Sequence, residues 1–285
     1  MNHTQLKLTL ACAAFLASSA TSALEVTDRN SSLGVNERNG ITTWFVDGRP
    51  DNVFLSNYYL RLDDAGMESP LSELLGDPDV TSQGNTLTLE FSGEALSATL
   101  DYTLVGGAPS SGASGFSKSL HLTNVGDDAL LLNLFDYSDF DIKFDQLAQA
   151  DQTEIVGPGA LVTRSATVPY ALSTVVTGPD RYEVGSFFDL YTKFFLDQDG
   201  ATVLTNTPMV GAIFPEPASD NAFAFQWTRT LAPGQSFAVN HTSALAPVPV
   251  PAALPLFAGG LFALLRSAGR RRGLSGMTAL TSNRG

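Results

Sequence analysis

The amino-acid sequence predicts an all-β fold, a large antiparallel β-sandwich, over residues 24–246. Short segments in which apolar and polar residues alternate recur along this region at the spacing typical of sandwiches. Glycine-containing pairs such as Asp47-Gly48 and Gly106-Gly107 separate several of these segments. Such pairs favour hairpin turns, because they accept the positive φ angles that these turns require.

Each predicted strand is apolar or alternating along its length. In chain order the predicted strands cover residues 42–46, 53–62, 86–91, 95–104, 117–123, 130–144, 160–163, 170–176, 187–196, 201–204, 210–214, 222–230 and 236–242. The stretch from Ser69 to Gly76 differs, because its serine, proline, leucines and glycine follow the order that opens and closes a helical turn. Ser69 is the expected N-cap and Pro70 the first helical residue.

The second half of the strand predicted from residue 130 carries a possible cation site. Alternation there puts apolar residues on one face and Asp139, Asp141 and Asp145 on the other. Hard cations bind clustered carboxylates, but side chains two residues apart on a strand are about 7 Å apart. We therefore expect the acidic face to be solvated, with Asp139, Asp141 and Asp145 as weak metal candidates. No metal or cofactor is predicted.

Aromatic residues gather in three predicted strands and allow two interpretations. They are Trp44, Phe45, Phe54, Tyr58, Tyr59 and Trp227. Aromatic rings can stack on sugars, but large sandwich cores also bury them. Trp44 shares a strand face with Val46, and Trp227 shares one with Phe225, so we expect both tryptophans in the core.

Composition narrows the possible partners and reactions. The chain has 29 acidic and 16 basic residues and a net charge of −13, which argues against nucleic acid. The region between the two ends has only His121 and His241 as histidines, no cysteine and no G-x-S-x-G motif. We expect a protein that is not an enzyme, although a carboxylate pair of the kind used in glycoside hydrolysis stays an alternative.

The first 23 residues have the order of a signal peptide. Lys7 precedes the short apolar run 8–16, and small residues follow up to Ala23. Cleavage after Ala23 is expected, with Ala20 as the alternative; acylation of Cys12 as a lipoprotein is less favoured. Because Cys12 is the only cysteine, the mature chain would form no disulfide. The sequence thus predicts export across the inner membrane, with signal peptidase as a partner.

The C-terminal end predicts a hydrophobic helix followed by a basic stop. The prolines of 247–251 lead into the uncharged run 252–265, and arginines follow it. A helix over this run would be about 21 Å long, short of the roughly 30 Å hydrocarbon core. Counting 248–265 as the membrane segment still gives a marginal span. Its arginines would be cytoplasmic, and 273–285 would form a cytoplasmic extension.

The residues of this tail, 247–272, resemble a known class of sorting signal. They are Val248, Pro249, Val250, Pro251 and Ala252, then Gly259-Gly260, and finally Arg270, Arg271 and Arg272. The pattern is similar to PEP-CTERM tails, particularly their VPLPA variant. Two departures are Val250, where the variant usually has leucine, and the extension past the basic cluster. An ordinary transmembrane anchor is the alternative.

The resemblance implies recognition by an exosortase, a multi-spanning membrane cysteine protease. It implies a Gram-negative bacterium and a transiently anchored protein that reaches the cell surface or the extracellular space. The region before the tail is faintly similar to uncharacterised ectodomains that accompany such tails, through Trp44, Tyr58-Tyr59 and Phe225-Gln-Trp227. We expect a structural or adhesive protein of an exopolysaccharide or biofilm matrix. The alternative is a non-catalytic carbohydrate-binding β-sandwich, with polysaccharide as a candidate partner.

Overall fold

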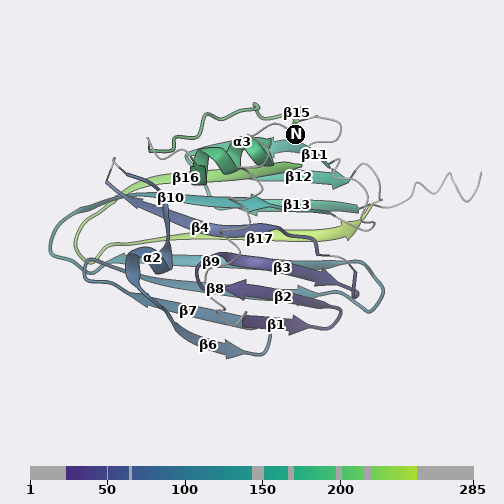
Figure 1. Cartoon of the computed structure of the whole chain (residues 1–285), viewed down its shortest axis with the longest axis horizontal. Coiled ribbons are helices and arrows are strands. Elements are labelled where there is room, and N and C mark those ends of the chain that lie inside the picture. The colour runs from purple at the N-terminus through teal and green to yellow at the C-terminus, as the bar shows by residue number, and fades with distance from the viewer. Residues whose placement is uncertain are drawn as a thin grey trace, which may run out of the picture. The chain divides into compact units, whose positions relative to one another are not determined.

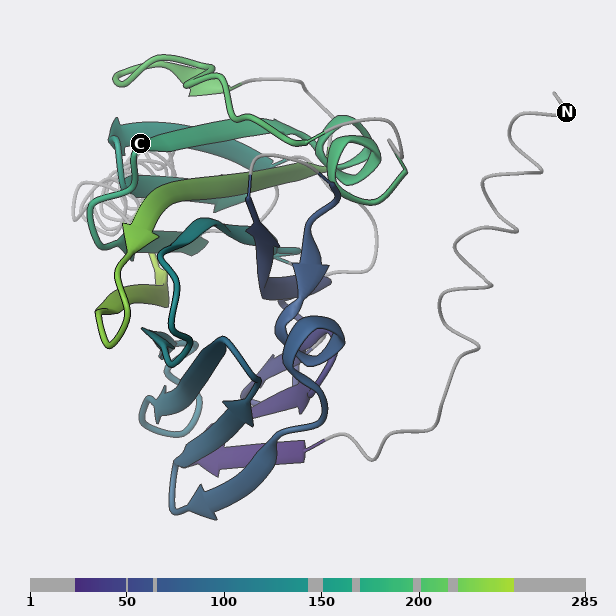
Figure 2. The same cartoon turned by 90° about the vertical axis from the view of Figure 1, so that its left-hand side faces the viewer.

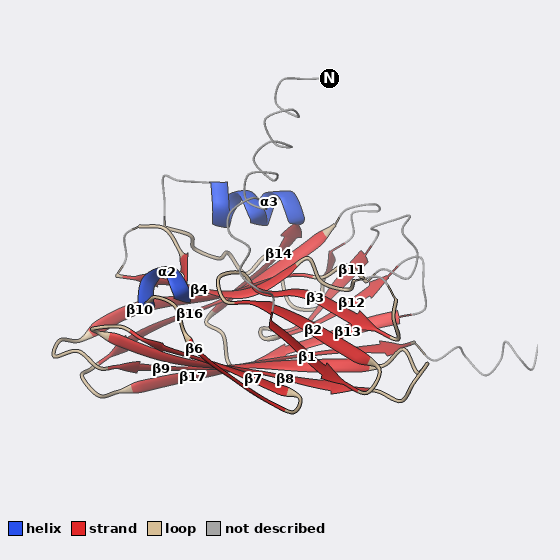
Figure 3. Cartoon of the chain, turned by 60° about the horizontal axis from the view of Figure 1, so that its bottom comes forward, coloured by secondary structure: helices blue, strands red, loops and turns tan. Residues whose placement is uncertain are grey.

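The computed structural model confirms the all-β fold as two antiparallel sheets that form a β-sandwich (Figure 3). It describes residues 24–49, 51–63, 66–142, 151–165, 170–196, 201–214 and 220–248. The sandwich lies in a compact unit that ends at Pro247, and a second unit begins at Val248. The signal peptide 1–23 and all but the first residue of the tail from Val248 lie outside the described residues.

Within the described residues, sheet A has eight strands (Figure 1). Its order is β1 (Leu24–Asp28), β2 (Ser31–Asn36), β3 (Gly40–Val46), β4 (Leu55–Leu62), β10 (Leu130–Asp139), β16 (Asn221–Leu231) and β14 (Arg181–Ser186), with β5 (Ser69–Pro70) paired to β4. The longest pairing is β10 with β16, in which Leu134 lies opposite Trp227. Strand β10 is an interior strand of this sheet, between β4 and β16.

Sheet B has nine strands in the described part of the chain, seen from the side in Figure 2. Its order is β15 (Ile213–Phe214), β11 (Asp151–Gly157), β12 (Ala160–Ser165), β13 (Tyr170–Val176), β17 (Ser236–Pro247), β9 (Ser114–Asn124), β8 (Leu96–Gly106), β7 (Thr86–Ser92) and β6 (Asp79–Gln83). Strands β8 and β9 alternate regularly between buried and less buried residues. This period of two is what a sheet with one face in the core requires.

The predicted helical turn is confirmed, with one change at its start. Helix α2 spans Leu71–Leu75 and ends at Gly76, whose φ of 87° is the left-handed conformation that glycine adopts readily. Pro70, not Ser69, is the N-cap, because Ser69 and Pro70 pair with β4 as strand β5. The Asp47-Gly48 turn is also confirmed, with φ angles of 56° and 66°.

Gly106-Gly107 does not form the predicted turn. Neither residue has positive φ, and Gly106 ends strand β8. Glycine is needed here for close approach instead, because a Cβ on Gly106 would lie 2.0 Å from the carbonyl oxygen of Asp28.

Residues 187–196 are helical, so the strand predicted there is wrong. Helix α3 spans Phe187–Tyr191, and the π-helical segment η1 spans Thr192–Leu196. The Ser186 side chain accepts a hydrogen bond from the backbone N–H of Asp189 at 3.2 Å and so caps the helix. Buried Leu190 and Phe194 are four residues apart, which is the spacing of one helix face.

The strand predicted over residues 201–204 is also absent from the described structure. Side chains satisfy this backbone in place of a neighbouring strand. Glu68 accepts from the N–H of Thr202 at 2.9 Å, and Gln226 accepts from the N–H of Leu204 at 3.0 Å. The segment therefore runs over the sheet without joining it.

Other strands differ from prediction in extent. Strand β10 ends at Asp139, β15 covers only Ile213–Phe214, and β17 continues to Pro247. The sequence pattern does not predict β1, β2, β6, β11 and β14. Several of these strands are rich in polar residues; β6, for example, is exposed along its whole length. Strand β6 therefore lacks the apolar alternation on which the prediction depends.

The space between the sheets is a single apolar core with both tryptophans inside it, as predicted. Trp44 is completely buried, and its indole N–H donates to Ser114 Oγ on the opposite sheet at 3.1 Å. Trp227 is 1% exposed, and its N–H donates to the carbonyl of Thr177 at 2.8 Å. Each ring has thus paired its one polar group.

The outer face of sheet A is covered as well, by α3 and η1 (Figure 1). The buried residues there are Tyr59, Phe135, Tyr137, Leu190, Phe194, Leu204, Ala222 and Ala224. The rings of Phe135 and Phe194 lie 5.6 Å apart between centroids. Strand β10 is consequently buried on both faces over most of its length.

Trp227→Ala should lower the free energy of unfolding by about 3–5 kcal/mol, because it leaves a large cavity and an unpaired carbonyl at Thr177. The midpoint of urea unfolding measures this loss. The control is Phe45→Ala, since Phe45 is 38% exposed and its removal should change the midpoint little. Equal midpoints for Trp227→Ala and the wild-type chain would contradict the core assignment.

Candidate functional site

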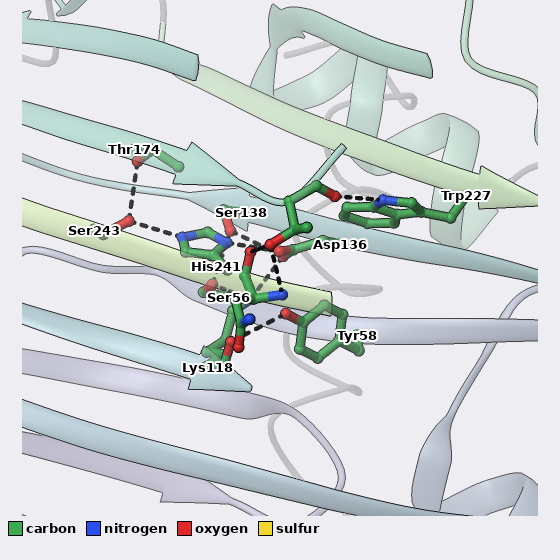
Figure 4. A network of polar contacts seen from close by, with 11 residues as sticks. Ser56, Tyr58, Lys118, Asp136, Ser138, Thr174, Trp227, His241 and Ser243 are labelled. Carbon is green, nitrogen blue, oxygen red and sulfur yellow. Dashed lines mark hydrogen bonds and ion pairs between the residues drawn. The ribbon is translucent and has the colours of Figure 1, made fainter. Parts of the chain in front are cut away.

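A polar network lies in the apolar core between the two sheets (Figure 4). Its members are Ser56, Tyr58, Lys118, Asp136, Ser138, Thr174, His241 and Ser243. Each of these residues is at most 1% exposed. Buried charges are rare unless they are paired, so this cluster is the strongest candidate for a specialised site in the described structure.

Strand register brings the charged members together. On sheet B, Lys118 of β9 lies opposite Tyr102 of β8 and His241 of β17. On sheet A, Asp136 of β10 lies opposite Tyr58 of β4. All of these side chains occupy positions that face the other sheet. The carboxylate of Asp136 therefore contacts Lys118 and His241 across the core.

Asp136 joins Lys118 and His241. Its Oδ1 accepts from Lys118 Nζ at 2.6 Å, and its Oδ2 lies 2.6 Å from His241 Nδ1. Lys118 Nζ also donates to Ser56 Oγ at 2.8 Å and lies 4.5 Å from the centroid of the Tyr58 ring. The ammonium thus has a carboxylate, a hydroxyl and an aromatic face around it.

The contacts of His241 define its tautomer. A carboxylate only accepts, so His241 Nδ1 carries the hydrogen that Asp136 receives. In the neutral ring, Nε2 then accepts from the Ser243 hydroxyl at 2.8 Å. Ser243 in turn accepts from Thr174 Oγ1 at 2.9 Å. The ring of His241 stacks on Phe116, with 5.8 Å between centroids.

Burial and mutual contact shift the pKa values of all three ionisable groups. Burial lowers the pKa of Lys118, and the neighbouring Asp136 opposes this. Burial also lowers the pKa of His241, which favours the neutral ring. Burial alone would raise the pKa of Asp136, but its contacts with His241 and Lys118 outweigh burial and hold that pKa below its usual value. One ammonium and one carboxylate therefore balance each other in the core.

Ser243, His241 and Asp136 follow the hydroxyl, imidazole and carboxylate order of a nucleophilic triad. All three side chains are completely buried, and Ser243 is also bonded to Thr174. No solvent-exposed atom of this group is available to a substrate. The arrangement can bind and transfer protons within the core, between residues that already touch one another.

Lys118, Asp136 and Ser243 are not among the site residues predicted from the sequence. A signal for Lys118 and Ser243 was present, because each stands in the inward phase of an alternating strand. Lys118 lies between Phe116 and Leu120 on β9, two residues that are both buried. A charged residue at an apolar position indicates a buried partner, but the sequence does not identify that partner.

The structure corrects the expectation of a solvated acidic face. Asp139 is 1% exposed and Asp141 is 9% exposed. Asp139 ends β10, the strand that sheet B covers on one face and α3 with η1 on the other, and Asp141 lies just beyond it. Asp145, the third weak metal candidate, lies outside the described residues. Among the residues that are described, no group of three or more metal-ligating side chains is found.

The aromatic candidates divide between core and surface. Tyr58 belongs to the polar network and Tyr59 to the cluster outside sheet A. Phe45 and Phe54 are exposed, at 38% and 48%. A sugar-stacking surface made of the tryptophans is therefore wrong, whereas Phe54 remains available at the surface.

The predicted sorting residues cannot be compared with the structure beyond Val248. Ala23, Pro249, Val250, Pro251, Ala252, Arg270, Arg271 and Arg272 lie outside the described residues. Val248 itself is 39% exposed and follows the end of β17 directly. No helix in the described ranges is long and apolar enough to span a membrane.

Comparisons with known proteins identify a fold but no family. No protein-family model matches the chain, and no curated protein matches its sequence. A galactose mutarotase related enzyme from Lactobacillus acidophilus has a similar structure, with a TM-score of 0.52 and 7% identity, over 80% of this chain and 100% of that chain. A galactose mutarotase-like protein from Lactobacillus casei matches with a TM-score of 0.52 and 8% identity, over 79% and 100%.

A GalM/aldose epimerase homologue from C. elegans matches with a TM-score of 0.50 and 11% identity, over 81% of this chain and 100% of that chain. At such identities the likeness establishes the β-sandwich architecture alone.

Lys118→Met should lower the free energy of unfolding by about 3–5 kcal/mol, since it leaves the carboxylate of Asp136 buried without its cation. Urea unfolding measures the loss. The matched control is Arg164→Met, which breaks a pair with Glu154 whose side chains are 48% and 33% exposed and should cost only about 0–1 kcal/mol. Similar losses for both variants would show that Lys118 is not the essential partner of Asp136.

Proposed function

We propose that this chain is an exported protein of a Gram-negative bacterium, sorted by an exosortase-type protease. Its β-sandwich serves a structural or adhesive role at the cell surface or in an exopolysaccharide or biofilm matrix. The observation that carries this proposal is the order of the tail, in which the proline motif, an apolar run and Arg270-Arg271-Arg272 follow one another. The membrane contact, through 248–265, is transient.

The position of the proline motif along the chain supports processing. Strand β17 is hydrogen-bonded to β13 up to Pro247, and the motif begins at the next residue. Cleavage near this point would leave the last strand of the sandwich whole. A protease also requires an extended, accessible segment, and Val248 is neither in a strand nor buried.

The buried state of the polar network supports a role other than catalysis. His241, which has the partners of a catalytic base, is sealed in the core. The other histidine of the sandwich, His121, is exposed and has only a weak contact with Thr123, at 3.5 Å. The acidic composition is suited to a protein that must stay soluble outside the cell.

A second candidate function is carbohydrate binding without catalysis, and one surface feature favours it. Phe54, Phe187, Tyr191 and Phe195 form a continuous set of rings that we call the aromatic row. Neighbouring centroids are 5.4, 5.1 and 4.7 Å apart. Phe54 is 48% exposed, and the others are partly exposed. Accessible rings of this kind can pack against the apolar faces of sugars.

In cells that have the sorting enzyme, the extracellular protein should begin at Leu24 and end near Val248. Intact-mass measurement of the secreted material checks both ends. Replacing Arg270, Arg271 and Arg272 with glutamine should leave the tail attached, because the basic stop would be lost. The matched control is Arg284→Gln, which lies beyond the cluster and should be processed normally. Secreted wild-type protein that keeps residues 270–285 would contradict the proposal.

If the alternative function holds, the purified full chain should bind polysaccharides on a glycan array. Phe54→Ala should then weaken binding about fivefold to tenfold, because an aromatic contact contributes roughly 1 kcal/mol or more. Phe45→Ala is the matched control, since Phe45 is an exposed phenylalanine outside the aromatic row. Absence of binding to every glycan would leave the structural role as the better account.

A further inference from the structure

Lys118 and Asp136 are unusual even among buried ion pairs. Both side chains are 0% exposed, and Lys118 Nζ lies 2.6 Å from Asp136 Oδ1. The carboxyl carbon is one bond beyond that oxygen, so the amine nitrogen lies about 3–3.5 Å from it, the separation of groups that are ready to react. An amine, a carboxyl group and no bulk water are the conditions under which amide formation is favoured over hydrolysis.

A third group completes the site. His241 Nδ1–H donates to Asp136 Oδ2, the oxygen that Lys118 does not contact, at 2.6 Å. If the nitrogen of Lys118 attacked the carboxyl carbon, negative charge would develop on Oδ2, and this donor would stabilise it. Ser56 Oγ holds the same nitrogen from another side at 2.8 Å, and Ser243 holds His241 in place. The geometry combines a nucleophile, an electrophile and an oxyanion donor.

We propose that Lys118 and Asp136 join in an intramolecular isopeptide bond, formed by the folded domain itself with His241 as the catalytic group. The bond would link β9 of sheet B to β10 of sheet A. Condensation would replace two buried charges with a neutral amide, which removes the penalty of keeping ions in an apolar core. It would also supply a covalent cross-link to a sandwich in which no cysteine is present.

The reaction balances without any other reactant. A proton first passes from Lys118 Nζ to Asp136 Oδ1 along their hydrogen bond, which gives an amine and a carboxylic acid. The nitrogen lone pair then attacks the carboxyl carbon, and the electron pair of the C=O bond moves to Oδ2, where His241 Nδ1–H stabilises it. A second proton passes from the nitrogen to Oδ1, the bond from carbon to Oδ1 breaks, and water leaves. The C=O bond re-forms at Oδ2, still bonded to His241.

Mass spectrometry of the purified full chain tests the proposal. The denatured protein should weigh one water less than its sequence, after allowance for the termini found. Proteolysis should release a branched peptide that contains both Lys118 and Asp136. Recovery of these residues only in separate linear peptides would overturn the proposal. Lys193 and Glu183 are the internal control, because this pair, at 2.8 Å, is partly exposed and its carboxylate accepts from Thr205 instead of an imidazole, so it should stay unlinked.

Three variants test the separate roles. Lys118→Arg keeps the positive charge without the amine and should retain its full mass. Asp136→Asn should yield the same amide by releasing ammonia, so its linked mass should equal that of the wild-type chain. His241→Leu, which has no N–H donor in its side chain, should slow linking by on the order of a hundredfold to a thousandfold, as loss of one oxyanion donor does. Linking at the wild-type rate in His241→Leu would remove His241 from the mechanism, while the mass of the wild-type chain still decides whether the bond exists.

Discussion

The relative position of the two sheets depends on the carboxylate of Asp136. It lies on β10, an interior strand of sheet A, and receives hydrogen bonds from Lys118 and His241 of sheet B. Apolar contacts between sheets are not directional, whereas these bonds require one relative position of β10, β9 and β17. The network therefore fixes how the two sheets face each other, and the surrounding rings, including Phe116 and Tyr58, exclude water from it.

Burial of β10 on both faces follows from the way the chain covers sheet A. The segment 187–196 is helical and lays Phe194 over Phe135 and Tyr137. Segment 201–204 is then held by side chains, through Glu68 and Gln226. The same covering brings Phe187, Tyr191 and Phe195 together at the surface next to Phe54. The helical segment 187–196 thus shields β10 from solvent and also forms most of the aromatic row.

The proposed roles have a common physical requirement. A protein exported into a matrix must persist without the reducing and refolding machinery of the cytoplasm, and this chain has no cysteine after the predicted signal peptide. Its stability has to come from apolar burial and from the polar network. A covalent link between Lys118 and Asp136 would serve this requirement as a disulfide does elsewhere, and it would do so through groups that the core already contains.

The sequence by itself determined the fold class, the positions of most long strands, the α2 turn and the burial of both tryptophans. Those features depend on local patterns, such as alternation along a strand or a glycine that ends a helix. Tertiary structure decided which patterned segments pair, that 187–196 is helical, and that Asp139 and Asp141 are buried. It also decided that Lys118, Asp136 and His241 meet, because their contacts cross between sheets over separations of 18 and 105 residues. Nothing in the local sequence encodes such a distance; only the packing of the two sheets brings these residues together.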